Sequence, residues 1–249
     1  MRIKKNIAII ENHIISTNTV RQKLTQALMD MGYNVTILST GTSKELAIAE
    51  SKGFKIIEVG TSNTNIFDVL RYMKNLRSAL VQTKADVCLT FTMRPAIWGN
   101  LVARLLRIPS ITNITGIGPL AESETLAYKV ARVLYRFVLK KAVVVFFQNN
   151  DDLNIFIEKK FVAMRQAVVI PGSGIDYDYF APQPQKRTDG QFVFLFISRL
   201  IKDKGILEYV EASKHLMKIN PGLVCQVLGP YYSQNLKENI ITEKQIMHW

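Results

Sequence analysis

Short apolar runs alternate with amphipathic stretches along most of this 249-residue chain. The runs have the length and the β-branched content of buried strands, whereas the stretches between them repeat apolar residues at helical spacing. We predict strands at residues 7–10, 34–38, 55–58, 87–91, 110–114, 143–147 and 168–170, and helices at residues 17–31, 43–52, 65–84, 95–106, 122–141 and 151–160. Gly32 and Gly53 follow the first two helices, a position where glycine commonly ends a helix. The alternation predicts an α/β domain with a doubly wound, mostly parallel sheet that helices cover on both faces.

The segment at residues 171–190 interrupts this alternation with prolines, glycines and charges, as in an inter-domain linker. After it we predict a strand at 192–197, a helix at 205–219, a strand at 223–228 and a helix at 234–244. These elements occupy about 60 residues, which would bury too little surface for independent stability. We therefore predict a complete first domain over residues 1–170, the linker, and the beginning of a second α/β domain over residues 191–249.

The chain is strongly basic, with a formal net charge of +12 and an isoelectric point near 9.7. Nucleic acid, anionic lipid and phosphate-bearing substrates are the partners that such a charge attracts. The sequence contains no zinc-ligand spacing, no arginine-rich arm and no aromatic ribonucleoprotein motif. We therefore predict no binding of nucleic acid.

Apolar runs that would target or anchor the chain are missing from the sequence. The run at residues 7–10 is shorter than the core of a signal peptide, and no later run approaches the ~18 residues of a membrane span. Cys88 and Cys225 are far apart, each among apolar residues, which predicts buried free thiols. These features predict a cytoplasmic protein that touches a membrane only from outside.

Candidate binding residues follow the strands, because ligands of open parallel sheets bind beyond the carboxyl ends of the strands. The candidates are Ser16 after the first strand, Arg94 after the fourth, Thr115 and Gly116 after the fifth, Asn149, Asn150 and Asp151 after the sixth, and Gly172 and Gly174 in the linker. Simpler structural interpretations exist: Ser16 or Thr17, and Asn150 or Asp151, would cap the following helix, and the glycines would form tight turns. The glycines at 116 and 118 do not make the dinucleotide fingerprint, which argues against NAD.

A different kind of site is predicted in the second domain, where the apolar strand in FVFLFISRLIKDKG runs into a basic loop before a helix. The loop offers Arg199 and Lys204. Two cations at a helix N-terminus can hold a phosphate or diphosphate. The alternative is a solvated basic loop without a ligand.

Five segments occur in an order that resembles bacterial retaining glycosyltransferases of family 4, particularly those that build capsular polysaccharide and O-antigen. The segments are TMRPAIWGNLVARL, ITNITGIG, VVFFQNNDDL, IPGSGID and FLFISRLIKDKGILEYVEA, and they cover essentially the whole chain. The resemblance implies the GT-B architecture, in which two Rossmann-like domains face a cleft. The first domain would hold mainly the acceptor, and the second mainly the nucleotide-sugar.

The resemblance also implies roles for individual residues. Arg199 and Lys204 match the arginine and lysine that hold the donor diphosphate and stabilise its growing charge as it leaves, so no metal or other cofactor is required. Gly116 matches a glycine near the transferred sugar, and residues 149–151 fall on the acceptor side. The family's pair of glutamates in the later second domain has no counterpart here, which implies a truncated donor pocket.

The predicted helix at 122–141 combines a basic side with an apolar one. Its cations are Lys129, Arg132, Arg136 and Lys140, and its apolar residues include Val130, Val133, Leu134, Phe137 and Val138. Such a helix can lie on an anionic leaflet, or it can be an ordinary surface helix with a solvated charged side. Because the enzymes that this chain resembles use acceptors attached to a polyprenyl diphosphate lipid, we expect peripheral binding to the inner face of the cell membrane.

We therefore expect the chain to transfer a hexose or N-acetylhexosamine from a UDP-linked donor to a lipid-linked saccharide, with retention, in surface polysaccharide biosynthesis. Two alternatives stay open. The chain could be an inactive remnant, or one half of a split enzyme that works with a complementary C-terminal fragment. It could also be a sugar-nucleotide epimerase of similar two-domain build, which would need no lipid acceptor.

Overall fold

The computed structural model describes residues 5–60, 65–116, 125–182, 191–230 and 240–249. The chain divides into two compact units, Met1–Phe180 and Ala181–Trp249. The division falls inside the segment 171–190 that the sequence predicts as a linker, of which residues 183–190 lie outside the described part.

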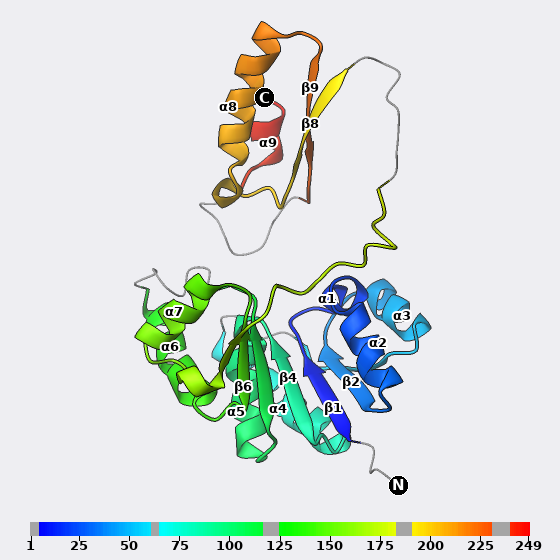
Figure 1. Cartoon of the computed structure of the whole chain (residues 1–249), viewed down its shortest axis with the longest axis vertical. Coiled ribbons are helices and arrows are strands. Elements are labelled where there is room, and N and C mark those ends of the chain that lie inside the picture. Colours follow the sequence, from blue (N-terminus) through cyan, green and yellow to red (C-terminus); the bar gives the residue numbers. More distant parts are fainter. Residues whose placement is uncertain (1–4, 61–64, 117–124, 183–190, 231–239) are drawn as a thin grey trace. The chain divides into compact units, whose positions relative to one another are not determined.

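A parallel sheet of seven strands forms the centre of the first unit (Figure 1). Its strands are β1 (Asn6–Ile10), β2 (Asn34–Ser39), β3 (Lys55–Glu58), β4 (Val87–Phe91), β5 (Ser110–Ile114), β6 (Val144–Phe147) and β7 (Ala167–Val169). They lie in the order β3-β2-β1-β4-β5-β6-β7, so the chain reverses its direction of travel between β1 and β4. The doubly wound α/β fold predicted from the sequence is confirmed, with each strand within one residue of its predicted bounds.

Helices cover the sheet on both faces because the strands alternate two apolar faces. Ile7 and Ile9 of β1 pack with helical residues between positions 28 and 49, whereas Ala8 and Ile10 pack with helical residues between positions 72 and 103. The helices are α1 (Ile15–Asn18), α2 (Gln22–Asp30), α3 (Ser43–Ser51), α4 (Ile66–Gln82), α5 (Asn100–Leu105), α6 (Leu126–Leu139) and α7 (Asn150–Glu158), with short helical turns η1 (Pro95–Gly99) and η3 (Met164–Gln166). The first part of the predicted helix 122–141 lies outside the described residues.

Local signals in the sequence predict several helix ends correctly. Gly32 and Gly53 have φ angles of +86° and +82°, a conformation that other residues rarely adopt.

Cys88 is buried and free, and burial raises the pKa of its thiol to about 12. Cys225 is also free but only half-buried, so the predicted burial of both thiols holds for Cys88 alone.

The helix predicted at 17–31 is interrupted in the structure. α1 ends at Asn18 and α2 begins at Gln22, and Thr19 and Arg21 between them leave helical geometry. The reason is the side chain of Arg21, which turns into the protein to pair with Glu11. The amphipathic pattern continues through the break, so periodicity alone could not reveal it.

The helix predicted at 95–106 begins instead with a π-helical turn, η1, before α5. Its cause is the buried side chain of Asn100, whose amide nitrogen donates to the Ala96 carbonyl at 2.6 Å and to the Thr112 hydroxyl at 2.8 Å. The side-chain amide thus donates to the carbonyl oxygen that would accept the Asn100 backbone N–H in an α-helix. π-Helical turns often lie at functional sites, and η1 directly follows Arg94.

The second unit has a sheet of two parallel strands, β8 (Phe192–Ile197) and β9 (Leu223–Leu228), with helix α8 (Ile206–Ile219) packed beside it. The helix predicted at 234–244 is wrong at residues 240–242 and is confirmed at Glu243 and Lys244. Ile240 pairs with Ile201 in an antiparallel bridge, and helix α9 (Glu243–Ile246) begins only after its N-cap, Thr242. Residues 234–239 lie outside the described residues.

Candidate functional site

The carboxyl ends of β1 and β4 meet at the point where the strand order reverses, the usual ligand position in such sheets. The Asn12 side-chain amide, after β1, donates to the Thr92 hydroxyl, after β4, at 3.0 Å. Thr92 has a φ angle of +68°, which is uncommon for a β-branched residue. Strained residues of this kind cluster at functional sites. The sequence did not reveal Asn12 or Thr92, because threonine does not signal a positive φ angle and the hydrogen bond joins residues 80 positions apart.

Glu11 and Arg21 form a buried ion pair beside the loop that follows β1. They are 1% and 5% exposed, and an Arg21 nitrogen donates to a Glu11 oxygen at 3.0 Å. The other Glu11 oxygen accepts a hydrogen bond from the Thr17 hydroxyl at 2.8 Å, and the guanidinium of Arg21 lies 4.3 Å from the Phe91 ring centre. Burial raises the pKa of Glu11, and Arg21 opposes that shift. The pair anchors the loop after β1. The signal for it in the sequence is an acidic residue, Glu11, directly after an apolar strand.

Ser16 lies inside the short helix α1, half-buried, and Thr17 is buried against Glu11. The interpretation of Ser16 or Thr17 as a helix cap is wrong, because α1 begins at Ile15 and its N-cap, Ile14, offers no side-chain bond. The hydroxyl of Thr17 is used for the carboxylate instead.

Thr115 and Gly116 follow β5 and are exposed, and Gly116 has a φ angle of +145°. A Cβ added at Gly116 would meet no atom of the described residues within 4 Å, so the positive φ angle rather than crowding favours glycine there. The second glycine of the pair, Gly118, lies outside the described residues.

Asn149, Asn150 and Asp151 follow β6 at the N-terminus of α7, and all three are exposed. The predicted cap at Asn150 or Asp151 is wrong by one or two positions. Asn149 is the cap, since its side-chain oxygen accepts the backbone N–H of Asp152 at 2.7 Å. Asn150 and Asp151 therefore keep side chains that the cap does not use.

The segment after β7 runs along the same edge toward α1 and α2 (Figure 1). Gly172 and Gly174 have φ angles of +81° and +74°, so both turns need glycine. The segment is held by Ser173, whose hydroxyl accepts from Gln148 at 3.0 Å, and by Asp176, which pairs with Lys23 of α2 at 2.9 Å. The hydrogen bond and charge of Lys23 hold the pKa of the Asp176 carboxyl below its usual value.

Arg94 is half-buried at the junction of β4 and η1. Its charge acts on Tyr72 of α4: burial raises the pKa of Tyr72, and the positive charge of Arg94 opposes that shift. The Tyr72 hydroxyl is buried without a hydrogen-bond partner in the described structure. A guanidinium beside it gives this end of the sheet a fixed positive charge.

The candidate phosphate site lies in the second unit, between β8 and α8. Arg199 follows β8 by two residues and is exposed, and Lys204 ends the short helical turn η4 (Lys202–Lys204). Leu200 and Ile201, next to Arg199, are buried and fix the loop from beneath. The backbone of Gly205 is left-handed, and α8 begins at Ile206 without a side-chain cap. The loop thus presents cations beside an uncapped helix N-terminus, where backbone N–H groups favour an anion.

Gly229 allows the ends of β8 and β9 to approach each other beside this loop. A Cβ at Gly229 would overlap the backbone carbonyl oxygen of Ser198, the neighbour of Arg199. We expect Gly229→Ala to force the strand ends apart and to destabilise the second unit by about 1–3 kcal/mol, the usual range for overpacking. Urea denaturation followed by Trp249 fluorescence measures this, with Gly222→Ala as the control, because a Cβ there meets only the Asn220 side chain. Equal midpoints for the two variants would contradict the prediction.

In the described part of the chain, no three His, Cys, Asp or Glu side chains gather where a metal ion could be held. No described helix combines the length and the apolar character that crossing a bilayer requires.

Residues 17–172 match the family described as "Glycosyl transferase 4-like domain", a range that includes β2 to β7. The chain belongs to this family. The matched residues include six of the seven strands of the first unit, whereas β1 and the β8–β9 unit lie outside them. The α/β fold with a second, smaller sheet agrees with the GT-B class of glycosyltransferases.

An Escherichia coli enzyme named UDP-Gal:alpha-D-GlcNAc-diphosphoundecaprenol alpha-1,3-galactosyltransferase is 25% identical over 201 residues, covering 74% of this chain and 51% of that protein. A glycosyltransferase from Rickettsia africae has a similar structure, with a TM-score of 0.66, 20% identity, and coverage of 91% of this chain and 60% of that one. Anabaena HepE, solved with UDP and glucose, has a TM-score of 0.65 and 14% identity and covers 89% of this chain and 61% of that one. The chain thus spans about half the length of the galactosyltransferase.

Proposed function

We propose that this glycosyl transferase 4-like chain moves a hexose or N-acetylhexosamine from a UDP-sugar to a saccharide carried on a polyprenyl diphosphate lipid. The observation that carries the proposal is the similarity to the E. coli galactosyltransferase, whose name states a UDP-linked donor and a diphosphoundecaprenol-linked acceptor. The order of motifs further supports retention at the anomeric carbon, a role in capsule or O-antigen synthesis, and attachment to the inner face of the cell membrane. No metal or other cofactor takes part in this scheme.

On the donor side, Arg199 and Lys204 hold the diphosphate at the N-terminus of α8. The geometry of the β8–α8 loop supports this assignment, because buried Leu200 and Ile201 fix the backbone that carries both cations. As the bond between sugar and diphosphate breaks, negative charge grows on the leaving group. Preorganised cations stabilise that charge more in the transition state than in the ground state.

On the acceptor side, the residues that follow β1, β4, β5, β6 and β7 bind the lipid-linked saccharide. They are Ser16, Arg94, Thr115, Gly116, Asn149, Asn150, Asp151, Gly172 and Gly174. Their support is topological, since the carboxyl ends of parallel strands share one edge of the sheet. Exposed amide and carboxylate groups such as those of Asn150 and Asp151 suit the hydroxyl groups of a saccharide.

A donor panel tests the function. UDP-glucose, UDP-galactose and their N-acetylated analogues are each incubated with the chain and a polyprenyl-diphosphate-linked saccharide, and the lipid product is analysed by mass spectrometry and by NMR of the new anomeric centre. We expect one donor to give a lipid-linked product with the anomeric configuration of the donor. Inversion would reject retention, and a free epimerised sugar formed without acceptor would identify an epimerase instead.

One observation favours a split enzyme as the second candidate. The β8–β9 sheet exposes large apolar side chains, among them Phe192, Ile197 and Leu228. An α/β sheet normally covers such residues on both faces. In this candidate the chain binds acceptor and membrane, and a complementary C-terminal fragment covers the sheet and completes the donor pocket. The donor panel is therefore run with and without the C-terminal half of the galactosyltransferase relative, and transfer only with the fragment identifies this case.

A further inference from the structure

Helix α6 presents an apolar stripe to solvent along its whole length. The stripe consists of Leu126, Val130, Val133 and Phe137, which are 77%, 50%, 64% and 50% exposed. At about 100° per residue these positions fall within an arc of about 60°. Tyr135, Val138 and Leu139 of the same helix are buried in the core on the opposite side. The stripe is therefore surplus to the packing of the domain, and its cost in water calls for a partner.

Cations lie beside the stripe. Lys129, Arg132 and Arg136 lie along one side, and α6 contains no acidic residue. The guanidinium of Arg104 from α5 also reaches the stripe, because it lies 3.9 Å from the centre of the Phe137 ring and donates to the Phe137 carbonyl at 2.8 Å. An apolar stripe with a basic margin is the arrangement of helices that lie in a membrane interface.

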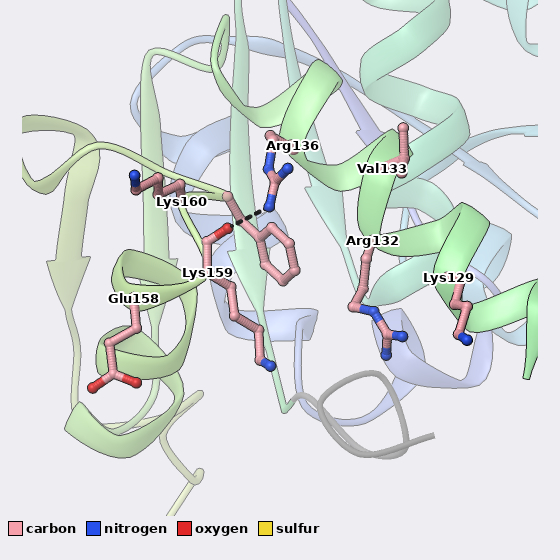
Figure 2. A pocket seen from close by; sticks show the side chains of 8 residues that line it. Lys129, Arg132, Val133, Arg136, Glu158, Lys159 and Lys160 are labelled. Atoms are coloured by element: carbon pink, nitrogen blue, oxygen red, sulfur yellow. Dashed lines mark hydrogen bonds between the residues drawn. The ribbon is translucent and has the colours of Figure 1, made fainter. Parts of the chain in front are cut away.

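A hollow of about 510 Å³ opens beside the basic margin, between α6 and the residues that end α7 (Figure 2). It is lined by Lys129, Arg132, Val133, Arg136, Glu158, Lys159, Lys160 and Phe161, which gives five positive and one negative side chain and a formal charge of +4. Arg136 donates to the Lys159 carbonyl at 2.9 Å and ties the two walls together. In Figure 2 the carboxylate of Glu158 points away from the arginines, so the hollow itself is basic.

We propose that α6 and this hollow form a membrane-docking surface, in which the stripe enters the leaflet and the hollow receives the phosphate of an anionic phospholipid. Charge complementarity favours this occupant over a second copy of the chain, because two +4 hollows would repel each other. A soluble phosphate compound would fill the hollow but leave the apolar stripe in water. A leaflet covers both features, with the helix axis in the headgroup region.

This surface deepens the proposed function. It rests on that function for one premise only, that the chain meets a membrane. It assigns the membrane attachment to named residues of the first unit, and these differ from the residues of the loops at the carboxyl ends of the strands. Vesicle binding requires no sugar transfer. A chain that binds vesicles but transfers nothing would reject the enzyme and keep the surface.

Flotation of the whole chain with vesicles tests the proposal. Vesicles of phosphatidylcholine alone are compared with vesicles that also contain phosphatidylglycerol, at low and high salt. We expect recovery with the anionic vesicles only, decreasing with salt. Arg132→Gln with Lys159→Gln should lower the partition coefficient about 25-fold, or about fivefold per cation. The control removes two cations elsewhere, Lys44→Gln with Lys55→Gln, both exposed near the β3 edge, and should bind like the wild type.

The stripe is tested separately by Leu126→Ser with Val133→Ser, both exposed and thus compatible with folding, which circular dichroism verifies. This variant should bind anionic vesicles about tenfold more weakly even at low salt. Equal recovery of the wild type with neutral and anionic vesicles would overturn the proposal, as would unchanged binding of the charge variant. If the stripe variant changed only the oligomeric state in size-exclusion chromatography, the partner would be a second copy of the chain.

Discussion

Replacing Arg199 or Lys204 by alanine is expected to lower kcat for sugar transfer by roughly two orders of magnitude, the usual effect of removing one group that stabilises developing charge. Both positions are exposed and lie between elements that are anchored by other residues, so neither change removes core packing. The loss should appear mainly in kcat, because the charge on the leaving diphosphate is greatest in the transition state. Steady-state kinetics with the donor found in the panel measures it.

A matched control lies in the same turn of the chain. Lys202 is exposed at the start of η4, two residues before Lys204, and Lys202→Ala removes the same charge from the same loop. We expect its transfer rate to stay within about threefold of the wild type, because general attraction of an anion is weak and screened by salt. Equal losses for Lys202→Ala and Lys204→Ala would assign the effect to overall charge. Unchanged turnover in Arg199→Ala and Lys204→Ala would remove both residues from the mechanism.

Arg21→Met is expected to lower the free energy of unfolding by about 3–5 kcal/mol at neutral pH, the largest of the expected effects on stability. The change leaves the Glu11 carboxylate buried without its ion-pair partner, although the bond from Thr17 persists. Glu11→Gln in the same chain should recover part of the loss, because it removes the uncompensated charge. Urea denaturation with Trp98 as the fluorescent reporter, in a Trp249→Phe background, measures both variants. Arg77→Met, an exposed position on α4, serves as the control.

The pH dependence of Arg21→Met provides an independent check. Burial raises the pKa of Glu11, and Arg21 is the largest factor that opposes the shift, so its removal raises that pKa further. An acid whose pKa is higher in the folded state stabilises the protein below its unfolded pKa, and this stability is lost as pH rises through the folded value. The variant should therefore be least destabilised at or below the ordinary pKa of a glutamate side chain and increasingly unstable above it. A penalty that does not change with pH would show that Glu11 is not the group left uncompensated.

The predicted strands are accurate because their signal is local. A strand covered on both faces must be apolar along its length, and Ile7 to Ile10 illustrate this with side chains in two separate clusters. The same holds for the glycines at helix ends, since only glycine adopts the left-handed backbone without strain. Candidate site residues could be predicted as a group, because the carboxyl ends of parallel strands share an edge. Their individual interactions could not, as the shift of the α7 cap to Asn149 demonstrates.

The sequence by itself determined the order of strands and helices, the basic loop before α8 and the amphipathic character of α6, because each depends on residue types at regular short spacings. Only the tertiary structure decided where the Glu11–Arg21 pair breaks a helix, where Asn100 opens a π-helical turn, and which apolar residues of α6 remain exposed. These features depend on contacts between residues that the folded chain brings together. Burial of a charge or of a polar side chain outweighs local helical preference, and no periodicity in the sequence records that competition.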